Sequence, residues 1–178
     1  ALNAIEVTLR PVDEADHATL LEIFDDWWDE RPKPKLERLW FRHWGSTSVL
    51  AVDARGRPAG LLIGFVSPDH PDEAVVRLLA VPAWARRRGV GRTMVEQFAQ
   101  LAIARGATRV VAGAKPGDPA AIGFLRALGF VAVAPPGSRP SYGVAALLDA
   151  GGRGEDVAPF ERAASGRPVQ AGEDASSR

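Results

Sequence analysis

The chain has 178 residues, of which 46% are hydrophobic and 25% charged, a composition typical of one globular domain with a substantial core. Basic and acidic residues number 22 each, so no overall charge favours nucleic acid or an anionic membrane as a partner. The absence of cysteine excludes disulfides, thiolate metal sites and a cysteine nucleophile, and three scattered histidines predict no metal site. We expect a cytoplasmic protein, because no secretory leader and no run of about 18 apolar residues is present.

The first part of the chain predicts a strand followed by two helices. Apolar and polar residues alternate over residues 5–9, which is the pattern of a half-buried strand. Acidic residues then open an amphipathic helix over 13–27. Pro32 and Pro34 interrupt this helix, and apolar residues at helical spacing predict a short second helix over 36–44.

The rest of the chain alternates between strands and helices. We expect strands at 48–53, 60–66, 75–81, 109–112, 130–133, 142–148 and 156–162, and helices at 90–105 and 119–128. Pro159 should confine the last strand to an edge or a bulge of the sheet. Residues 163–178 are small and polar and are expected to form a disordered tail after a domain at 1–162. This order of elements predicts a mixed α/β sheet with one strand-helix-strand crossover.

The segment 79–92 leaves a predicted strand and enters a predicted helix, and it is rich in arginine and glycine. Free N–H groups and the dipole at a helix start favour an anion, glycines allow its close approach, and arginines add charge-assisted hydrogen bonds. A pyrophosphate is the expected ligand.

Two other phosphate-binding patterns are excluded. The chain has no Gly-Lys followed by Ser or Thr, and Met94 stands where a dinucleotide fingerprint needs its third glycine.

Two motifs in this region resemble one protein family. The arginines and glycines of residues 86–91 are similar to the Gln/Arg-x-x-Gly-x-Gly/Ala acetyl-CoA motif of the GNAT superfamily of N-acetyltransferases, and residues 118–130 resemble its second conserved segment. The resemblance is specific from residue 74 to residue 130. It implies a mixed, GNAT-like α/β fold in which a central, mostly antiparallel sheet contains a parallel, splayed strand pair and is flanked by helices.

The resemblance also implies an activity. A GNAT enzyme moves the acetyl group of acetyl-CoA to a primary amine, here of a small molecule, by direct attack. The alternatives are a protein or peptide amine as acceptor, or a non-catalytic acyl-CoA-binding module. No metal, nucleic acid or membrane is implied, and the protein is expected to be a monomer or a homodimer. The residues implied to bind acetyl-CoA are Leu79, Val81, Arg86, Arg87, Arg88, Gly89, Val90, Gly91, Arg92, Asp118 and Phe124.

The sequence departs from the family at the position of the usual catalytic tyrosine, which Leu125 occupies. A thiol has an ordinary pKa of about 8.5, so the CoA thiolate can leave without a strong acid. The only tyrosine, Tyr142, is a second candidate for the acid. The alternative is an ordinary role in the core or at the surface. Glu73 is the first candidate for the general base, with His70 and Asp72 in the same loop as alternatives.

Acceptor recognition is expected in the tryptophan-rich region before and after the break between the first two helices. Trp27 and Trp28 are candidates for the wall of an apolar acceptor pocket, against a purely structural role in the core. Arg77 is a charge inside a predicted central strand. It is therefore a candidate for binding an acceptor carboxylate. The alternative is that Arg77 forms an ordinary ion pair at the rim of the sheet.

Overall fold

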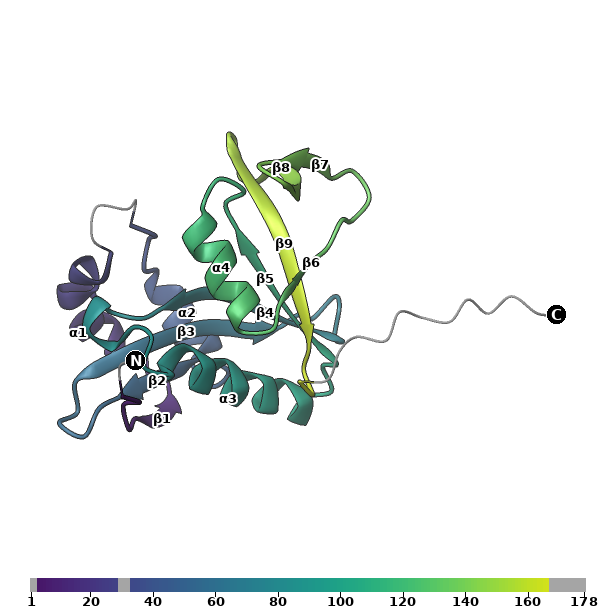
Figure 1. Cartoon of the computed structure of the whole chain (residues 1–178). Helices are drawn as coiled ribbons and strands as arrows, with labels where there is room; N and C mark the ends of the chain where they lie inside the picture. The colour runs from purple at the N-terminus through teal and green to yellow at the C-terminus, as the bar shows by residue number, and fades with distance from the viewer. Residues whose placement is uncertain (1–2, 29–32, 167–178) are drawn as a thin grey trace.

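The computed structural model describes residues 3–28 and 33–166, and within these ranges nine strands form one sheet (Figure 1). The strands are β1 (Thr8–Pro11), β2 (Val49–Val52), β3 (Pro58–Val66), β4 (Glu73–Ala80), β5 (Arg109–Ala114), β6 (Val131–Ala132), β7 (Arg139–Ser141), β8 (Val144–Gly152) and β9 (Glu155–Ala163). The helices are α1 (Asp16–Ile23), α2 (Arg38–Trp44), α3 (Val90–Ala104) and α4 (Pro119–Ala127), with short 3-10 helices η1 (Phe24–Trp27) and η2 (Ala83–Ala85). None of the helices in these ranges is long and apolar enough to cross a membrane.

The sheet has the strand order β1-β2-β3-β4-β5-β9-β8-β7, with β6 paired to β9. Every pair is antiparallel except β4 with β5, which α3 connects as a crossover. The mixed α/β sheet with one parallel pair, flanked by helices, confirms the predicted fold class.

Two cores cover the two faces of the sheet, because inward and outward residues alternate along the strands. One core packs α3 and α4 against the sheet through residues such as Met94, Phe98 and Ile122. The other packs α1, η1 and α2 through residues such as Leu20 and Phe41. Helices therefore cover both faces of the sheet, α3 and α4 on one and α1 and α2 on the other.

A β-bulge at Arg77 changes the face to which β4 directs its side chains. Ile63 of β3 lies opposite Leu78, but the next residue, Gly64, lies opposite Val76, so Arg77 is the extra residue. As a result Val76 belongs to the core under α3, whereas Leu78 belongs to the core under α1 and α2. Gly64 is required at this bulge, because a Cβ there would lie 2.6 Å from the ring of Phe98.

The parallel pairing of β4 with β5 also ends at this point. The last paired residues are Val76 and Ala112, although β4 continues to Ala80 and β5 to Ala114. The two strands therefore separate over their carboxyl ends, as expected for a splayed pair, and the separation begins at the bulge.

Most predicted elements agree with the structure, with three differences at the carboxyl-terminal part. Pro159 lies in an interior strand, not at an edge, because β9 has β5 on one side and β8 and β6 on the other. The carbonyl of Pro159 faces β6 and accepts a hydrogen bond from Val133 N–H. In an antiparallel strand the N–H of a residue points to the same side as its carbonyl. The N–H that proline lacks would therefore point to the place where β8 ends and β6 begins, and the sheet tolerates proline there. A short strand at 139–141 was not predicted.

The boundary of the domain also lies later than expected. Ala163 is the last residue of β9, and Ala164 is buried in the core and donates its N–H to the carbonyl of Thr108. Residues 163 and 164 therefore belong to the folded domain, and residues 167–178 of the predicted tail lie outside the described part of the chain.

Candidate active site

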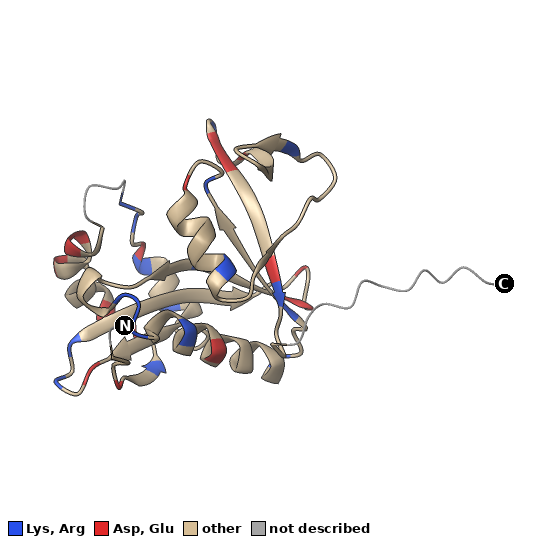
Figure 2. Ribbon diagram, viewed as in Figure 1, with Lys and Arg blue, Asp and Glu red and all other residues tan. Residues whose placement is uncertain are grey.

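The loop between β4 and α3 presents free backbone donors at the start of a 15-residue helix. Gly89 is the N-cap residue, with a left-handed φ of 88°, and no described side chain caps the helix. Arg87 is also left-handed, with φ of 59°. Figure 2 shows basic residues and no acidic ones in this loop. Its donors, helix dipole and charge all favour an anion.

Three of the four arginines in the predicted motif fasten the loop to other segments. Arg86 donates from Nε to the carbonyl of Val81 at 2.9 Å and from Nη2 to that of Trp27. Arg88 donates to the carbonyl of Asn3 at 3.0 Å, and Arg92 to that of Ala127 at 2.6 Å. The arginines therefore hold the loop between η1, the start of the described chain and α4.

The backbone of Leu79 faces the separation between β4 and β5. The carbonyl of Asp72 accepts from Thr108 and Arg109 of the β5 side, and successive residues of a strand face alternate sides. The alternation continues to Val76, and the extra residue Arg77 shifts it by one. Leu79 is therefore the next residue whose N–H and carbonyl point toward β5, where pairing has ended.

The second motif forms α4 and lies beside the loop. Asp118 caps α4 by accepting a hydrogen bond from Ala121 N–H at 3.0 Å, with Pro119 at the first helical position. The ring of Phe124 covers Gly91, where a Cβ would lie 2.6 Å from Phe124 Cζ. Leu125 is buried in the core of α3 and α4. The structure thus brings together Phe124, Gly91 and the start of α3.

Glu73 lies at the other end of β4. It is the first residue of the strand, six residues before Leu79, which corresponds to about 20 Å of extended chain. Its carboxylate pairs with Arg109, which also binds Asp72 and Glu161. Burial opposes the charge of Arg109, but its hydrogen bond to Glu161 and the nearby Glu73 and Asp72 raise its pKa overall. The structure does not bring Glu73 to the loop or to the separated strands.

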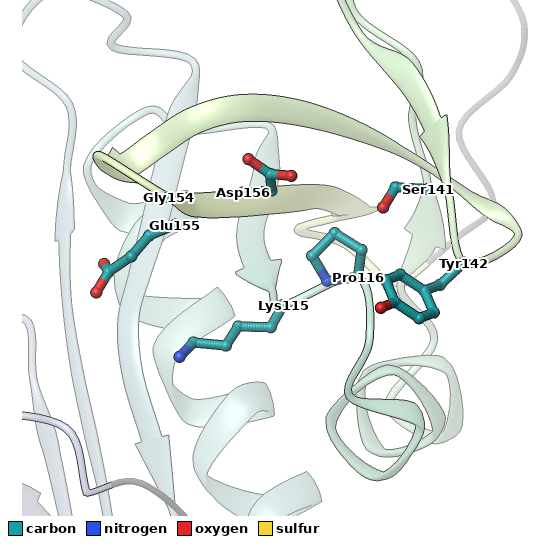
Figure 3. Close-up of a pocket in the computed structure, with 7 residues that line it drawn as sticks. All are labelled: Lys115, Pro116, Ser141, Tyr142, Gly154, Glu155 and Asp156. Atoms are coloured by element: carbon teal, nitrogen blue, oxygen red, sulfur yellow. The ribbon is translucent and has the colours of Figure 1, made fainter.

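Tyr142 lies at the turn between β7 and β8 and is 85% exposed. Its ring is near Gly117, just before α4, and it borders a hollow of about 150 Å³ at the carboxyl end of β5 (Figure 3). The hollow is lined by Lys115, Pro116, Ser141, Tyr142, Gly154, Glu155 and Asp156. The sequence pattern did not single out Lys115, which directly follows β5, or Glu155, which is the first residue of β9, because only the fold brings these two positions together.

The predicted acceptor residues occupy the face that carries α1 and α2. Trp27 is buried in that core, and Trp28 packs against it. Arg77 is exposed, and its guanidinium carbon lies 4.7 Å from the ring centroid of Trp40. Trp40 is parallel to Trp44, which in turn stacks on Phe65. Trp40 and Trp44 were expected only as part of a general aromatic region, because the contact of Trp40 with Arg77 depends on the bulge.

Comparisons with known proteins agree with this geometry. The model of the Acetyltransferase (GNAT) family matches residues 17–130. L-2,4-diaminobutyric acid acetyltransferase of Streptomyces coelicolor is 39% identical over 71 residues, 39% of this chain and 42% of the relative. The protein of the same name from Nocardia farcinica is 31% identical over 90 residues, 51% of this chain and 46% of the relative. The matches thus span less than half the length of these curated relatives.

A solved structure extends the similarity to nearly the whole fold. Ard1 from Thermoplasma volcanium superposes with a TM-score of 0.67 at 21% identity, covering 88% of this chain and 97% of that protein. At this identity the likeness concerns the fold alone. Together with the family match over most of the chain, it leads to one conclusion: the chain belongs to the GNAT acetyltransferase family.

Proposed function

We propose that this protein is an N-acetyltransferase that moves the acetyl group of acetyl-CoA to a primary amine of a small molecule by direct attack. The observation that carries the proposal is the separation of β4 from β5 after Val76 and Ala112, directly before a basic, glycine-rich loop that opens α3. Family membership and the name of the diaminobutyric acid acetyltransferase relatives support a small amine as acceptor.

The pyrophosphate of acetyl-CoA binds at the start of α3 in this proposal. The N–H groups of Val90, Gly91 and Arg92 supply donors there, because residues in the first turn of a helix have no intrahelical partner. Arg87 is exposed and supplies positive charge, whereas Arg86, Arg88 and Arg92 act mainly by holding the loop in place.

The pantetheine arm then enters between β4 and β5. There the backbone of Leu79 is available to the thioester carbonyl, and Val81 has its carbonyl bound by Arg86. Asp118 and Phe124 place α4 along the other side of the arm, Asp118 by capping the helix and Phe124 by covering Gly91. A backbone N–H at Leu79 suits the oxyanion, since it adds a fixed donor without a competing charge.

The acceptor approaches from the face of α1 and α2, so that Trp28 and Arg77 border its path and the buried Trp27 supports this wall from the core. Its neutral amine nitrogen attacks the thioester carbonyl carbon, and the resulting tetrahedral oxyanion collapses to an amide and the CoA thiolate. The amine proton passes to solvent. No acid is assigned to the thiolate, because Leu125 has no proton to donate and a thiolate of pKa about 8.5 leaves unaided. Glu73 remains with Arg109, and we assign it no step.

The test is acetyl transfer measured with purified protein. Acetyl-CoA is incubated with amines, amino acids and short peptides, L-2,4-diaminobutyrate among them, and CoA release and the amide product are quantified. We expect turnover with a small amine and acetyl-CoA binding by calorimetry. Faster turnover of peptide amines would replace the small-molecule assignment, and acetyl-CoA binding without any amide product would favour a binding module.

A further inference from the structure

We propose that Arg77 binds a carboxylate of the acceptor, so that the acetylated amine belongs to an amino acid or a related amine that carries a carboxylate. This inference rests on the proposed function and names the substrate class of the same site.

The bulge puts Arg77 where an acceptor must pass. It is the first residue of β4 after the last pair with β5, Val76 with Ala112, and it lies two residues before Leu79. In a regular strand Arg77 and Leu78 would point to opposite faces, but at a bulge the extra residue and its successor share one partner. Leu78 belongs to the core of α1 and α2, and Arg77 contacts Trp40 of α2. The cation therefore lies on the α2 face at the point where the strands separate.

The guanidinium of Arg77 is held in place but keeps its donors available. It stacks on Trp40, which is buried and lies parallel to Trp44 at 6.2 Å between ring centroids. Among the residues that the structure describes, Arg77 has no hydrogen bond and no ion pair. Its guanidinium lies instead over this aromatic ring. A ring binds a guanidinium by its face, and this leaves the planar fork of N–H donors at the edge free for a bidentate partner.

Other arginines of the sheet show the contrast. Arg109 of β5 has three carboxylates around it, and Arg162 of β9 binds Glu96 and a backbone carbonyl. Within residues 3–28 and 33–166, the exposed Arg42 on α2 likewise has no hydrogen bond or ion pair, but it lies outside the strands and the bulge. Arg77 alone among these four combines a central strand position, an aromatic support and an open fork. A carboxylate is the complementary group, because two parallel N–H···O bonds match its two oxygens.

The experiment compares matched acceptors that differ only in the carboxylate. L-2,4-diaminobutyrate is paired with 1,3-diaminopropane, ornithine with putrescine, and lysine with cadaverine. Each pair is tested with the wild type, Arg77→Met, Arg77→Lys and the control Arg42→Met. In the wild type we expect kcat/KM to be about 10- to 100-fold higher for the better carboxylate acceptor than for its partner, the range of one charge-assisted contact. Arg77→Met should remove this preference by lowering kcat/KM for the carboxylate members, while acetyl-CoA affinity stays within about twofold, and Arg77→Lys should restore only part of the preference.

Equal use of both members of every pair by the wild type would overturn the proposal, as would a preference that survives in Arg77→Met. If no amine is acetylated, the proposed function has failed, and binding of the same pairs to the CoA-loaded protein is then measured by calorimetry. Selective binding of the carboxylate member, lost in Arg77→Met and kept in Arg42→Met, would still support the carboxylate site. Absence of that selectivity would reject it.

Discussion

At the scale of single residues, the start of α3 depends on backbone conformation as much as on charge. Gly89 adopts a φ that L-residues other than asparagine and aspartate rarely accept, and it ends a run of arginines whose side chains mostly bind carbonyls. Much of the anion-binding capacity proposed here therefore resides in N–H groups. A residue that disturbs those groups or places a negative charge among them should reduce acetyl-CoA affinity.

The pair Gly89→Asn and Gly89→Asp separates strain from charge. Both side chains place a similar cost on the left-handed backbone, of about 1 kcal/mol, but only aspartate repels a pyrophosphate. We expect acetyl-CoA binding by Gly89→Asp to be at least about tenfold weaker than by Gly89→Asn, with a difference that shrinks as salt is added. Calorimetry at two salt concentrations measures this. Equal affinities of the two variants would contradict binding at the start of α3.

Substitution of Tyr142 tests whether the CoA thiolate needs an acid in order to leave. Since its ring is 85% exposed, Tyr142→Phe should not affect folding, and it removes only the hydroxyl. If the thiolate leaves unassisted, kcat should stay within about twofold and the alkaline limb of the pH–rate profile should not move. Loss of turnover with intact acetyl-CoA binding would instead identify Tyr142 as the acid. Glu73→Gln serves as the parallel control for the base, with the same expectation of unchanged turnover.

At the scale of elements, α3 and α4 touch through a glycine and an aromatic ring. Gly91 gives the ring of Phe124 room to lie on the start of α3, and Phe124 is 37% exposed there. The contact lies beside the proposed cofactor site and helps to set the spacing between the two helices. The family motif allows alanine at the position of Gly91. In this protein glycine is needed there because the ring of Phe124 occupies the space that a Cβ would fill.

A double-mutant cycle measures that contact. In Gly91→Ala the new Cβ displaces the Phe124 ring, and this should offset the roughly 1 kcal/mol that alanine gains over glycine in a helix. In a Phe124→Ala background the same change should stabilise the protein by that gain. Urea denaturation of the four proteins gives the coupling, expected at about 1 kcal/mol or more. Additive effects would show that the ring and Gly91 do not interact in solution.

At the scale of the whole molecule, a buried arginine joins one strand of the sheet, β9, to α3 and to the end of α4. Arg162 of β9 is 6% exposed and binds Glu96 of α3 at 3.0 Å and the carbonyl of Leu128, the residue after α4, at 3.0 Å. Arg92 of α3 also binds a carbonyl at the end of α4, that of Ala127. These contacts fix α4 against α3, so the width of the proposed cofactor groove depends on them.

Arg162→Met should therefore lower the free energy of unfolding by about 2–3 kcal/mol, because the carbonyl of Leu128 loses its buried donor and the helices lose a link. Glu96 is half-exposed and can be hydrated again, which limits the cost. The exposed Arg105→Met is the control, with an expected change within about 0.5 kcal/mol. Urea denaturation measures both, and a stability of Arg162→Met equal to that of the control would argue against a structural role for the pair.

The sequence alone determined the local features of this protein. The basic, glycine-rich segment before a helix, the capped start of α4 and the alternating strands all follow from neighbouring residues, since caps, glycine conformations and amphipathic patterns act over a few positions. These features also supported the family assignment and most of the element boundaries.

Tertiary structure decided what depends on distant partners. The bulge at Arg77 comes from the register of β4 against β3, and register is a property of two strands, so the sequence of β4 alone could not reveal which face Arg77 occupies. Glu73 looked available in its loop, but folding placed it beside Arg109 from a strand 36 positions later. Pro159 entered an interior strand because the neighbour on one side changes there from β8 to β6. In each case the chemistry of a side chain was evident from the sequence, and its partner was chosen by the fold.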